Sequence, residues 1–265
     1  MSASPGGAAL GPMLWQPVSG CGDHCRDGAD VPAARCLRTL RMVTLAVVLA
    51  GGFLLVPVLR GGALRNLARA MLAVLGIRLV RRGPAPRPGS LLAANHVSWL
   101  DILVLLAAAP VRLVAKGEVG GWPAIGALAG FSGAIFIDRS RPKRLPGTVA
   151  EVAAALRAGR TVAAFPEGTT FCGAGQGRFR PALFQAAIDA NAPVVPASIG
   201  YDSTAAAFIG DDTLWDSVRR VAALRSLTVT LVTAPALRPA ADADRRTLAR
   251  AAQSSLGVAG YRLAA

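Results

Sequence analysis

The chain of 265 residues has few acidic residues and few aromatic ones. Its 15 Asp and Glu residues face 29 Lys and Arg residues, which gives a formal net charge of +14. This excess predicts a polyanionic partner, either nucleic acid or an anionic membrane surface. Aromatic residues make up only 5% of the chain, which disfavours a stacking platform for single-stranded nucleic acid. Because 53% of the residues are hydrophobic, we expect membrane lipids as partners and no nucleic acid.

Cysteine is also scarce, with four residues, Cys21, Cys25, Cys36 and Cys172. The run from Cys21 to Cys25, which contains His24, invites a metal interpretation. Zinc sites usually take four ligands from separated pairs, however, and this run offers no second pair. The alternative is a flexible tail with reducible thiols, and we expect no metal ion. No disulfide framework is visible, which favours a reducing, cytoplasmic setting.

Histidine is nearly absent, and His96 is the only one outside the N-terminal 37 residues. A neutral-pH imidazole base in the folded body must therefore be His96. The chain also lacks a G-x-S-x-G pattern, which argues against a serine hydrolase with a nucleophile elbow.

The N-terminal third lacks the alternation of strands and helices that follows it. Residues 1–37 show no apolar periodicity and are predicted to form a disordered tail. Residues 42–59 carry no charge and would form a helix roughly 27 Å long, close to the thickness of a bilayer core. Residues 64–80 mix arginines with apolar residues and fit an interfacial amphipathic helix. We predict membrane-anchoring helices over 38–81, as one span or a hairpin in one leaflet, on the cytoplasmic face of the cell membrane; the alternative is a helix buried in the core.

Residues 82–89 alternate proline and glycine with other residues and are predicted to be a linker. After it, short apolar runs alternate with helical segments, which predicts an α/β domain over 90–265 with a mostly parallel sheet flanked by helices. The predicted strands are 91–94, 111–115, 134–137, 161–165, 194–199 and 227–232. The predicted helices are 100–109, 148–158, 181–190 and 213–224.

Three of the predicted strands run into polar clusters, at 95–101, 138–139 and 166–170. Ligands of open α/β sheets bind beyond the carboxyl ends of the strands, so these clusters are expected to face one crevice. Asp101 follows His96 at i+5, which on one helix is roughly 140° around the axis. The two side chains meet only if His96 lies in the turn before the helix and Asp101 in its first turn. Ser98 as N-cap allows this, and Asp101 would then also complete a capping box.

The ordered set of polar clusters resembles the four motifs of the lysophosphatidic acid acyltransferase family, also called glycerophospholipid acyltransferases. The matching segments are 95–101 (Asn-His-Val-Ser-Trp-Leu-Asp), 136–139 (Phe-Ile-Asp-Arg), 165–169 (Phe-Pro-Glu-Gly-Thr) and 194–198 (Val-Val-Pro-Ala-Ser). Residues 114–118 and 121–126 are similar as well, and the resemblance covers roughly residues 88–235. It implies a glycerolphosphate acyltransferase-like fold.

The resemblance implies an O-acyltransferase with His96 and Asp101 as its catalytic pair. The donor would be acyl-CoA or acyl-carrier protein, with no cofactor, and the acceptor a lysophospholipid, 1-acyl-sn-glycerol-3-phosphate, which becomes phosphatidic acid. Arg139 matches the arginine that holds the acceptor phosphate. Glu167 and Gly168 match the acceptor-binding motif.

Thr169 completes the acceptor-binding motif, but the next residue departs from the family. Thr170 stands where the family commonly has arginine. Lys116, Arg178 or Arg180 would then supply the missing cation, or the acceptor is a different lyso-lipid such as lyso-ornithine lipid. Two further alternatives stay open, a Cys172 nucleophile and a non-catalytic basic protein that binds membranes.

Overall fold

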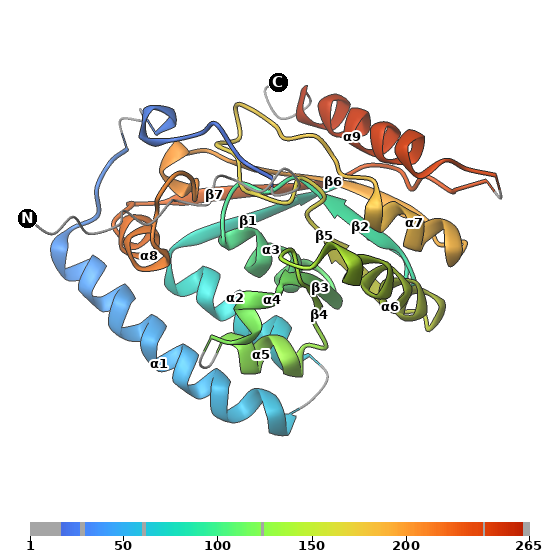
Figure 1. Ribbon diagram of the computed structural model, residues 1–265. Coiled ribbons are helices and arrows are strands. Elements are labelled where there is room, and N and C mark those ends of the chain that lie inside the picture. The colour runs from blue at the N-terminus through green and yellow to red at the C-terminus, as the bar shows by residue number, and fades with distance from the viewer. Residues whose placement is uncertain (1–16, 27–29, 60–61, 123–124, 241, 262–265) are drawn as a thin grey trace, which may run out of the picture.

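The structure is a computed structural model that describes residues 17–26, 30–59, 62–122, 125–240 and 242–261. Within these residues the strands form one seven-stranded sheet in the order β1-β7-β6-β2-β5-β3-β4. All described pairs are parallel except β6 with β7, which is antiparallel. The mostly parallel sheet predicted from the sequence is confirmed (Figure 1). The strands are β1 (Ile77–Arg82), β2 (Leu91–Ala94), β3 (Val111–Lys116), β4 (Ile135–Ile137), β5 (Thr161–Ala164), β6 (Val194–Tyr201) and β7 (Leu227–Thr233).

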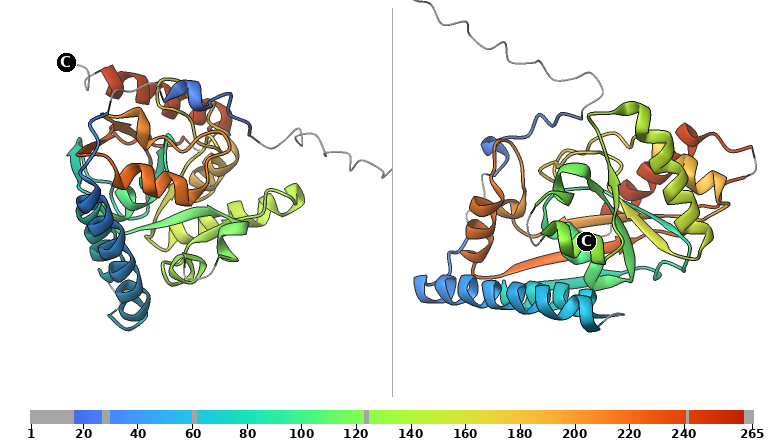
Figure 2. Two further views of the ribbon diagram at one scale, coloured as in Figure 1. Left: turned by 90° about the vertical axis from the view of Figure 1, so that its left-hand side faces the viewer. Right: turned by 60° about the horizontal axis from the view of Figure 1, so that its bottom comes forward.

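Helices cover both faces of the sheet (Figure 1, Figure 2). One apolar core joins the sheet to α1, α2, α3 and α8, and a second core joins it to α6, α7 and α9. The helices are α1 (Arg35–Leu59), α2 (Ala63–Val74), α3 (Leu100–Ala108), α4 (Gly117–Gly120), α5 (Ile125–Phe131), α6 (Leu145–Arg157), α7 (Ala182–Asp189), α8 (Leu214–Ala222) and α9 (Arg245–Tyr261). The six predicted strands and four predicted helices of the α/β domain are present, whereas β1, α4, α5 and α9 were not predicted.

The segment predicted as one amphipathic helix over 64–80 is two elements, so that prediction is wrong. Helix α2 ends at Val74, and Gly76 turns the chain with φ +72° before β1 begins at Ile77. A side chain at Gly76 would collide with the Arg41 guanidinium, so glycine is required there. The buried residues of α2, including Leu72, pack in the core rather than facing outward. The segment 82–89 connects β1 to β2 of the same sheet, so the α/β domain begins before the predicted linker.

Helix α1 is attached to the domain along one side. Gly52 lies so close to α2 that an added Cβ would stand 2.6 Å from Leu67 Cδ1. The buried Arg41 donates hydrogen bonds to the carbonyls of Leu224 (2.5 Å) and Ala222 (3.3 Å) at the end of α8. A cation is favourable there because the last carbonyls of a helix lack intrahelical partners.

The other side of α1 carries large apolar side chains that are exposed. They recur at helical spacing and form what we call the α1 stripe: Leu40, Val43, Val47, Leu54 and Val58. Leu54 is 70% exposed and Val58 75% exposed. Among the described residues, Arg35–Val56 is the one helical segment long and apolar enough to cross a membrane, with a mean hydropathy of 2.1.

Residues in the stretch predicted to be disordered make specific contacts with the domain. Residues 17–26 lie on the domain and include a 3₁₀ turn, Asp23–Cys25. Arg26 pairs with Asp212 at 3.4 Å and donates to the Ile209 carbonyl at 3.3 Å. The prediction of a disordered tail over 1–37 therefore does not hold for this segment, because specific polar contacts fix it. Residues 1–16 lie outside the described part of the chain.

Candidate active site

The turn between β2 and α3 is fixed by a buried amide. The side chain of Asn95 donates to the Ile199 carbonyl at 3.0 Å and accepts from the Ile199 N–H at 2.7 Å. These two bonds continue the β2–β6 pairing one residue past the end of β2. The backbone carbonyl of His96 also accepts from the Phe171 N–H at 2.8 Å. The turn is thus held by strand β6 on one side and by the loop after β5 on the other, which fixes the position of His96.

His96 and Asp101 are in direct contact. The distance from His96 Nδ1 to Asp101 Oδ2 is 2.8 Å. His96 lies in the turn and Asp101 in the first turn of α3, which is the arrangement the spacing required. Helix α3 begins at Leu100 as predicted, but Ser98 is not its N-cap, because Trp99 takes that position without a side-chain bond. Asp101 still accepts from the Ser98 N–H at 2.9 Å, which is half of the predicted capping box.

The Asp101 carboxylate has four donors around it, although its side chain is fully buried. Besides His96 and Ser98, Oδ2 accepts from the Val97 N–H at 2.7 Å, and Oδ1 accepts from the Tyr201 hydroxyl at 2.5 Å. Burial and the nearby Asp101 charge raise the pKa of Tyr201 well above its usual value, so the phenol is protonated and donates. Sequence reasoning missed Tyr201, which ends β6 one hundred residues further along and carries no local signal.

The His96 ring is held on its other side by an aromatic neighbour. Phe165 stacks on it with centroids 3.9 Å apart and an interplanar angle of 11°. Donation from Nδ1 to the carboxylate leaves Nε2 with a free lone pair. The side chain is 19% exposed, so the ring is oriented by its partners and still reachable. Such a ring can act as a general base.

Glu167 is buried beneath the same turn. Its Oε2 accepts from the His96 N–H at 2.6 Å, and its Oε1 accepts from the Gly177 N–H at 2.8 Å. Burial raises the pKa of Glu167 to about 7, although these two backbone donors lower it. Both oxygens are thus bonded to the protein itself, whereas the motif was predicted to bind the acceptor. Glu167 joins the His96 turn to the loop after β5.

Cations gather beside Gly168, at the carboxyl ends of β4 and β5. The Arg139 guanidinium donates to the Gly168 carbonyl, and the backbone N–H of Arg180 donates to the Pro166 carbonyl at 2.9 Å, which holds Arg180 at the same loop. Burial lowers the pKa of Arg139, Glu118 raises it and Arg180 lowers it further. Gly168 has φ +79°, a conformation that suits glycine.

The remaining predicted residues lie around these cations. Lys116 is exposed at the end of β3, where it pairs in register with Ile137, two residues before Arg139. Thr169 follows Gly168 and is half-buried. The Thr170 hydroxyl donates to the Phe208 carbonyl and so ties two loops together. The three polar clusters predicted to share one crevice thus lie at the same edge of the sheet, with His96 and Glu167 in contact and Arg139 reaching Gly168.

Comparison with known proteins gives this arrangement a family. A family profile described as Acyltransferase matches residues 74–200. The 1-acyl-sn-glycerol-3-phosphate acyltransferase of Neisseria meningitidis is 37% identical over 180 residues, which are 65% of this chain and 71% of that protein. The lyso-ornithine lipid O-acyltransferase of Pseudomonas aeruginosa is 38% identical over 189 residues, 69% of this chain and 72% of that one.

The fold has a solved counterpart. The crystal structure of the 1-acyl-sn-glycerophosphate acyltransferase PlsC from Thermotoga maritima superposes with a TM-score of 0.66, at 21% identity, over 87% of this chain and 96% of that one. Fold and site together define an α/β enzyme with an imidazole–carboxylate pair at the carboxyl edge of its sheet. The chain belongs to the acyltransferase family that includes these glycerophosphate and lyso-ornithine lipid enzymes. The family, the fold and the enzyme class predicted from the sequence are confirmed.

Proposed function

We propose that this acyltransferase moves a fatty acyl group from a thioester onto the free hydroxyl of a lysophospholipid. The observation that carries the proposal is the 2.8 Å contact between His96 Nδ1 and the buried Asp101 carboxylate. That contact orients Nε2 as a base, and the neighbouring cations suit an anionic acceptor. The donor is acyl-CoA or acyl-carrier protein.

The reaction proceeds by direct attack. His96 Nε2 takes the proton of the acceptor hydroxyl as its oxygen bonds to the thioester carbonyl carbon. The carbon–sulfur bond then breaks, and the leaving thiolate takes the proton from the imidazolium. Asp101 fixes the ring tautomer and stabilises the imidazolium, as the aspartate of a Ser-His-Asp triad does. Atoms and charges balance without a metal or redox cofactor.

Tyr201 and Glu167 position this pair and do not touch substrate. Tyr201 holds Oδ1 of Asp101, and Glu167 holds the backbone N–H of His96. Displacing either side chain would shift the His96 imidazole, and a displacement of about 1 Å in a catalytic group can lower kcat by about 100-fold.

The acceptor phosphate is bound by Arg139 and Lys116 beside the Gly168–Thr169 turn. A guanidinium matches the oxygens of a phosphate with two donors at once. The first acceptor we propose is 1-acyl-sn-glycerol-3-phosphate, with phosphatidic acid as product. Lyso-ornithine lipid is the alternative, favoured by Thr170, whose hydroxyl is bonded to the Phe208 carbonyl and adds no cation.

The enzyme works at the cytoplasmic face of the cell membrane. One side of α1 packs on α2, so the α1 stripe on its other side inserts among acyl chains while the helix lies along the surface. The net charge of +14 adds attraction to anionic lipids, which enrich the cytoplasmic leaflet.

Acyl transfer by purified protein tests the proposal. Wild type and His96→Ala are assayed with acyl-CoA and with acyl-carrier protein against a panel containing 1-acyl-sn-glycerol-3-phosphate, lyso-ornithine lipid and neutral lyso-lipids. We expect transfer to an anionic or zwitterionic lyso-lipid by wild type and none by the variant. Equal activity of the two proteins, or inertness of wild type with every acceptor, contradicts the proposal.

The same assay separates direct attack from an acyl-cysteine route. Cys172 follows the Gly168–Thr170 turn and is the nucleophile of the alternative mechanism. We expect Cys172→Ala to form product and wild type to accumulate no acyl-cysteine. A folded but inert Cys172→Ala protein would contradict direct attack.

A further inference from the structure

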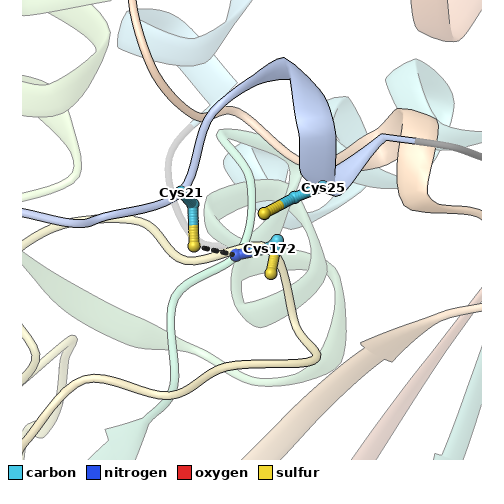
Figure 3. A group of neighbouring side chains, drawn as sticks. All are labelled: Cys21, Cys25 and Cys172. Atoms are coloured by element: carbon cyan, nitrogen blue, oxygen red, sulfur yellow. Dashed lines mark hydrogen bonds between the residues drawn. The ribbon is translucent and has the colours of Figure 1, made fainter.

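Three of the four cysteines converge although they are far apart in the sequence. The Sγ atoms of Cys21, Cys25 and Cys172 all lie within 4.8 Å of one another (Figure 3). Cys21 and Cys25 come from the N-terminal segment, and Cys172 comes from the loop after β5. All three are free thiols and half-buried. The acyl-transfer mechanism uses none of them.

We propose that these three thiolates bind one thiophilic divalent metal ion, Zn²⁺ in the cell. Tetrahedral Zn²⁺ with Zn–S distances of about 2.3 Å places its sulfur ligands roughly 3.8 Å apart. The observed group lies within 4.8 Å, so small side-chain rotations close the site. Cys21 and Cys25 are separated by three residues, a spacing common within zinc ligand pairs.

The surroundings suit a bound metal ion better than a disulfide. The Cys172 N–H donates to Cys21 Sγ at 3.4 Å, and such donors offset the charge of a metal-bound sulfur (Figure 3). The group contacts a small apolar cluster of Val97, Ala207 and Ile209, which shields it on one side. A disulfide would leave the third thiol unpaired, whereas a metal uses all three. His24 is exposed and outside the group, so the described residues offer three ligands and the fourth position would be left to solvent.

A metal ion at these sulfurs is contrary to the expectation that the chain binds no metal. That expectation rested on the lack of a second ligand pair near Cys21 and Cys25. The structure supplies the third sulfur from a loop about 150 residues further along the chain, which spacing rules do not detect.

The ion would act as a staple between the N-terminal segment and the loop that carries Glu167 and Gly168. The segment already reaches that loop, because an added Cβ at Gly168 would stand 2.8 Å from Pro17 Cγ. A metal ion bound by both Cys21 and Cys172 would hold this segment across the edge of the proposed acceptor site. The staple's effect on acyl transfer rests on the proposed function, whereas metal binding itself does not.

Metal content of the full-length protein is the direct test. The detergent-solubilised protein is purified with a phosphine reductant, stripped and titrated with Zn²⁺ and Co²⁺. We expect about one ion per chain and, with Co²⁺, the charge-transfer and d–d bands of tetrahedral thiolate coordination. Cys21→Ser and Cys172→Ser should each retain less than about a tenth of the ion at the same free concentration.

Cys36→Ser is the matched control, because Cys36 is exposed and outside the group. It should bind the ion as wild type does. Cys21 lies on the peripheral segment, so Cys21→Ser tests the site even if Cys172→Ser does not fold. Wild type without bound metal, equal binding by wild type and both variants, or a disulfide within the group in protein from reducing cytoplasm overturns the proposal.

Trypsin tests the staple without any acyl-transfer assay. Arg26 is the last residue of the described stretch 17–26 and pairs with Asp212. Chelation should speed cleavage after Arg26 by about tenfold in wild type, because the segment then opens locally. Cys172→Ser should be cut at the fast rate with or without metal. An unchanged wild-type rate after complete removal of bound Zn²⁺ overturns the staple but leaves acyl transfer untouched.

Discussion

The His96 turn and helix α1 are both unusual in burial, since the turn buries polar groups and the helix exposes apolar ones. The turn buries polar side chains, namely Asn95, Ser98, Asp101 and Glu167, and each of them has hydrogen-bond partners within the chain. Helix α1 exposes Leu54 and Val58, which nothing in the described chain covers. Buried polar groups must be satisfied by specific partners, whereas exposed apolar groups are stabilised by any apolar medium.

This difference separates two kinds of function. The geometry of the turn is determined inside the protein and depends on single atoms, so one substitution should remove one chemical step. The α1 stripe acts through summed area, so single substitutions there should be mild and combined ones large. If the two regions are independent, a substitution in one should leave the function of the other unchanged.

The largest expected effect is the loss of the base. His96→Ala should lower kcat by about 10³-fold or more, since general base catalysis contributes up to about 10⁴-fold. Binding to vesicles should not change, because the α1 stripe is intact. Activity is measured with the best acceptor from the panel, and vesicle binding by sedimentation. A variant that keeps more than a tenth of the wild-type kcat would show that His96 is not the catalytic base.

The next effect belongs to the α1 stripe. Val47→Lys combined with Leu54→Lys should weaken binding to anionic vesicles by about 100-fold or more, because each buried side chain contributes about 1.5–3 kcal/mol. Turnover of acceptor dispersed in detergent should stay near the wild-type value. Ala154→Lys with Ala158→Lys adds the same charge at exposed positions of α6 and its end, and should bind normally. Equal binding by both double variants would remove the membrane role of α1.

Most elements of the fold could be predicted from local sequence patterns. The elements that were not predicted depend on contacts between distant parts of the chain. The strands at 91–94 and 161–164 are short apolar runs before polar turns, so the sequence predicted both their positions and the polar clusters at their ends. Strand β1 escaped because Ile77 and Leu79 continue the apolar spacing of α2, and only Gly76 marks the break. Tertiary pairing of β1 with β7 decided between helix and strand.

The site divides in the same way. The contact between His96 and Asp101 could be predicted because both residues belong to one turn of chain. Tyr201 joins Asp101, and Cys172 joins Cys21, across separations that no spacing rule covers. Glu167 was predicted to face the acceptor, whereas its oxygens bond the backbone of two loops. The assigned roles of His96 and Asp101 in catalysis stay predictions until the variants are assayed.

Glu167 should make the stability of the folded protein depend on pH. Burial raises its pKa to about 7 from the usual 4.5, so the folded protein holds this proton more tightly than the unfolded chain. The resulting stability is fully present below about pH 4.5 and is lost as the pH rises through about 7, a change of up to about 3 kcal/mol.

Thermal unfolding of detergent-solubilised protein measures this pH effect. The difference in Tm between wild type and Glu167→Gln should change between pH 5 and pH 8, with wild type losing stability relative to the variant as the pH rises. Gln cannot titrate, so the group's pH dependence disappears in the variant. Parallel Tm curves for the two proteins would contradict a titration of Glu167 in this range.

The smallest effect, and the sharpest test of the turn, is Tyr201→Phe. The phenol donates to Asp101 Oδ1, while three other donors hold Oδ2, so removing it should leave the carboxylate in place but less restrained. A hydrogen bond to a charged group contributes about 1.5–3 kcal/mol. Because only part of this free energy stabilises the transition state, kcat should fall by about tenfold. KM for the acceptor should stay constant, because Tyr201 does not touch substrate in this mechanism. A raised KM with unchanged kcat would instead place Tyr201 in the acceptor site.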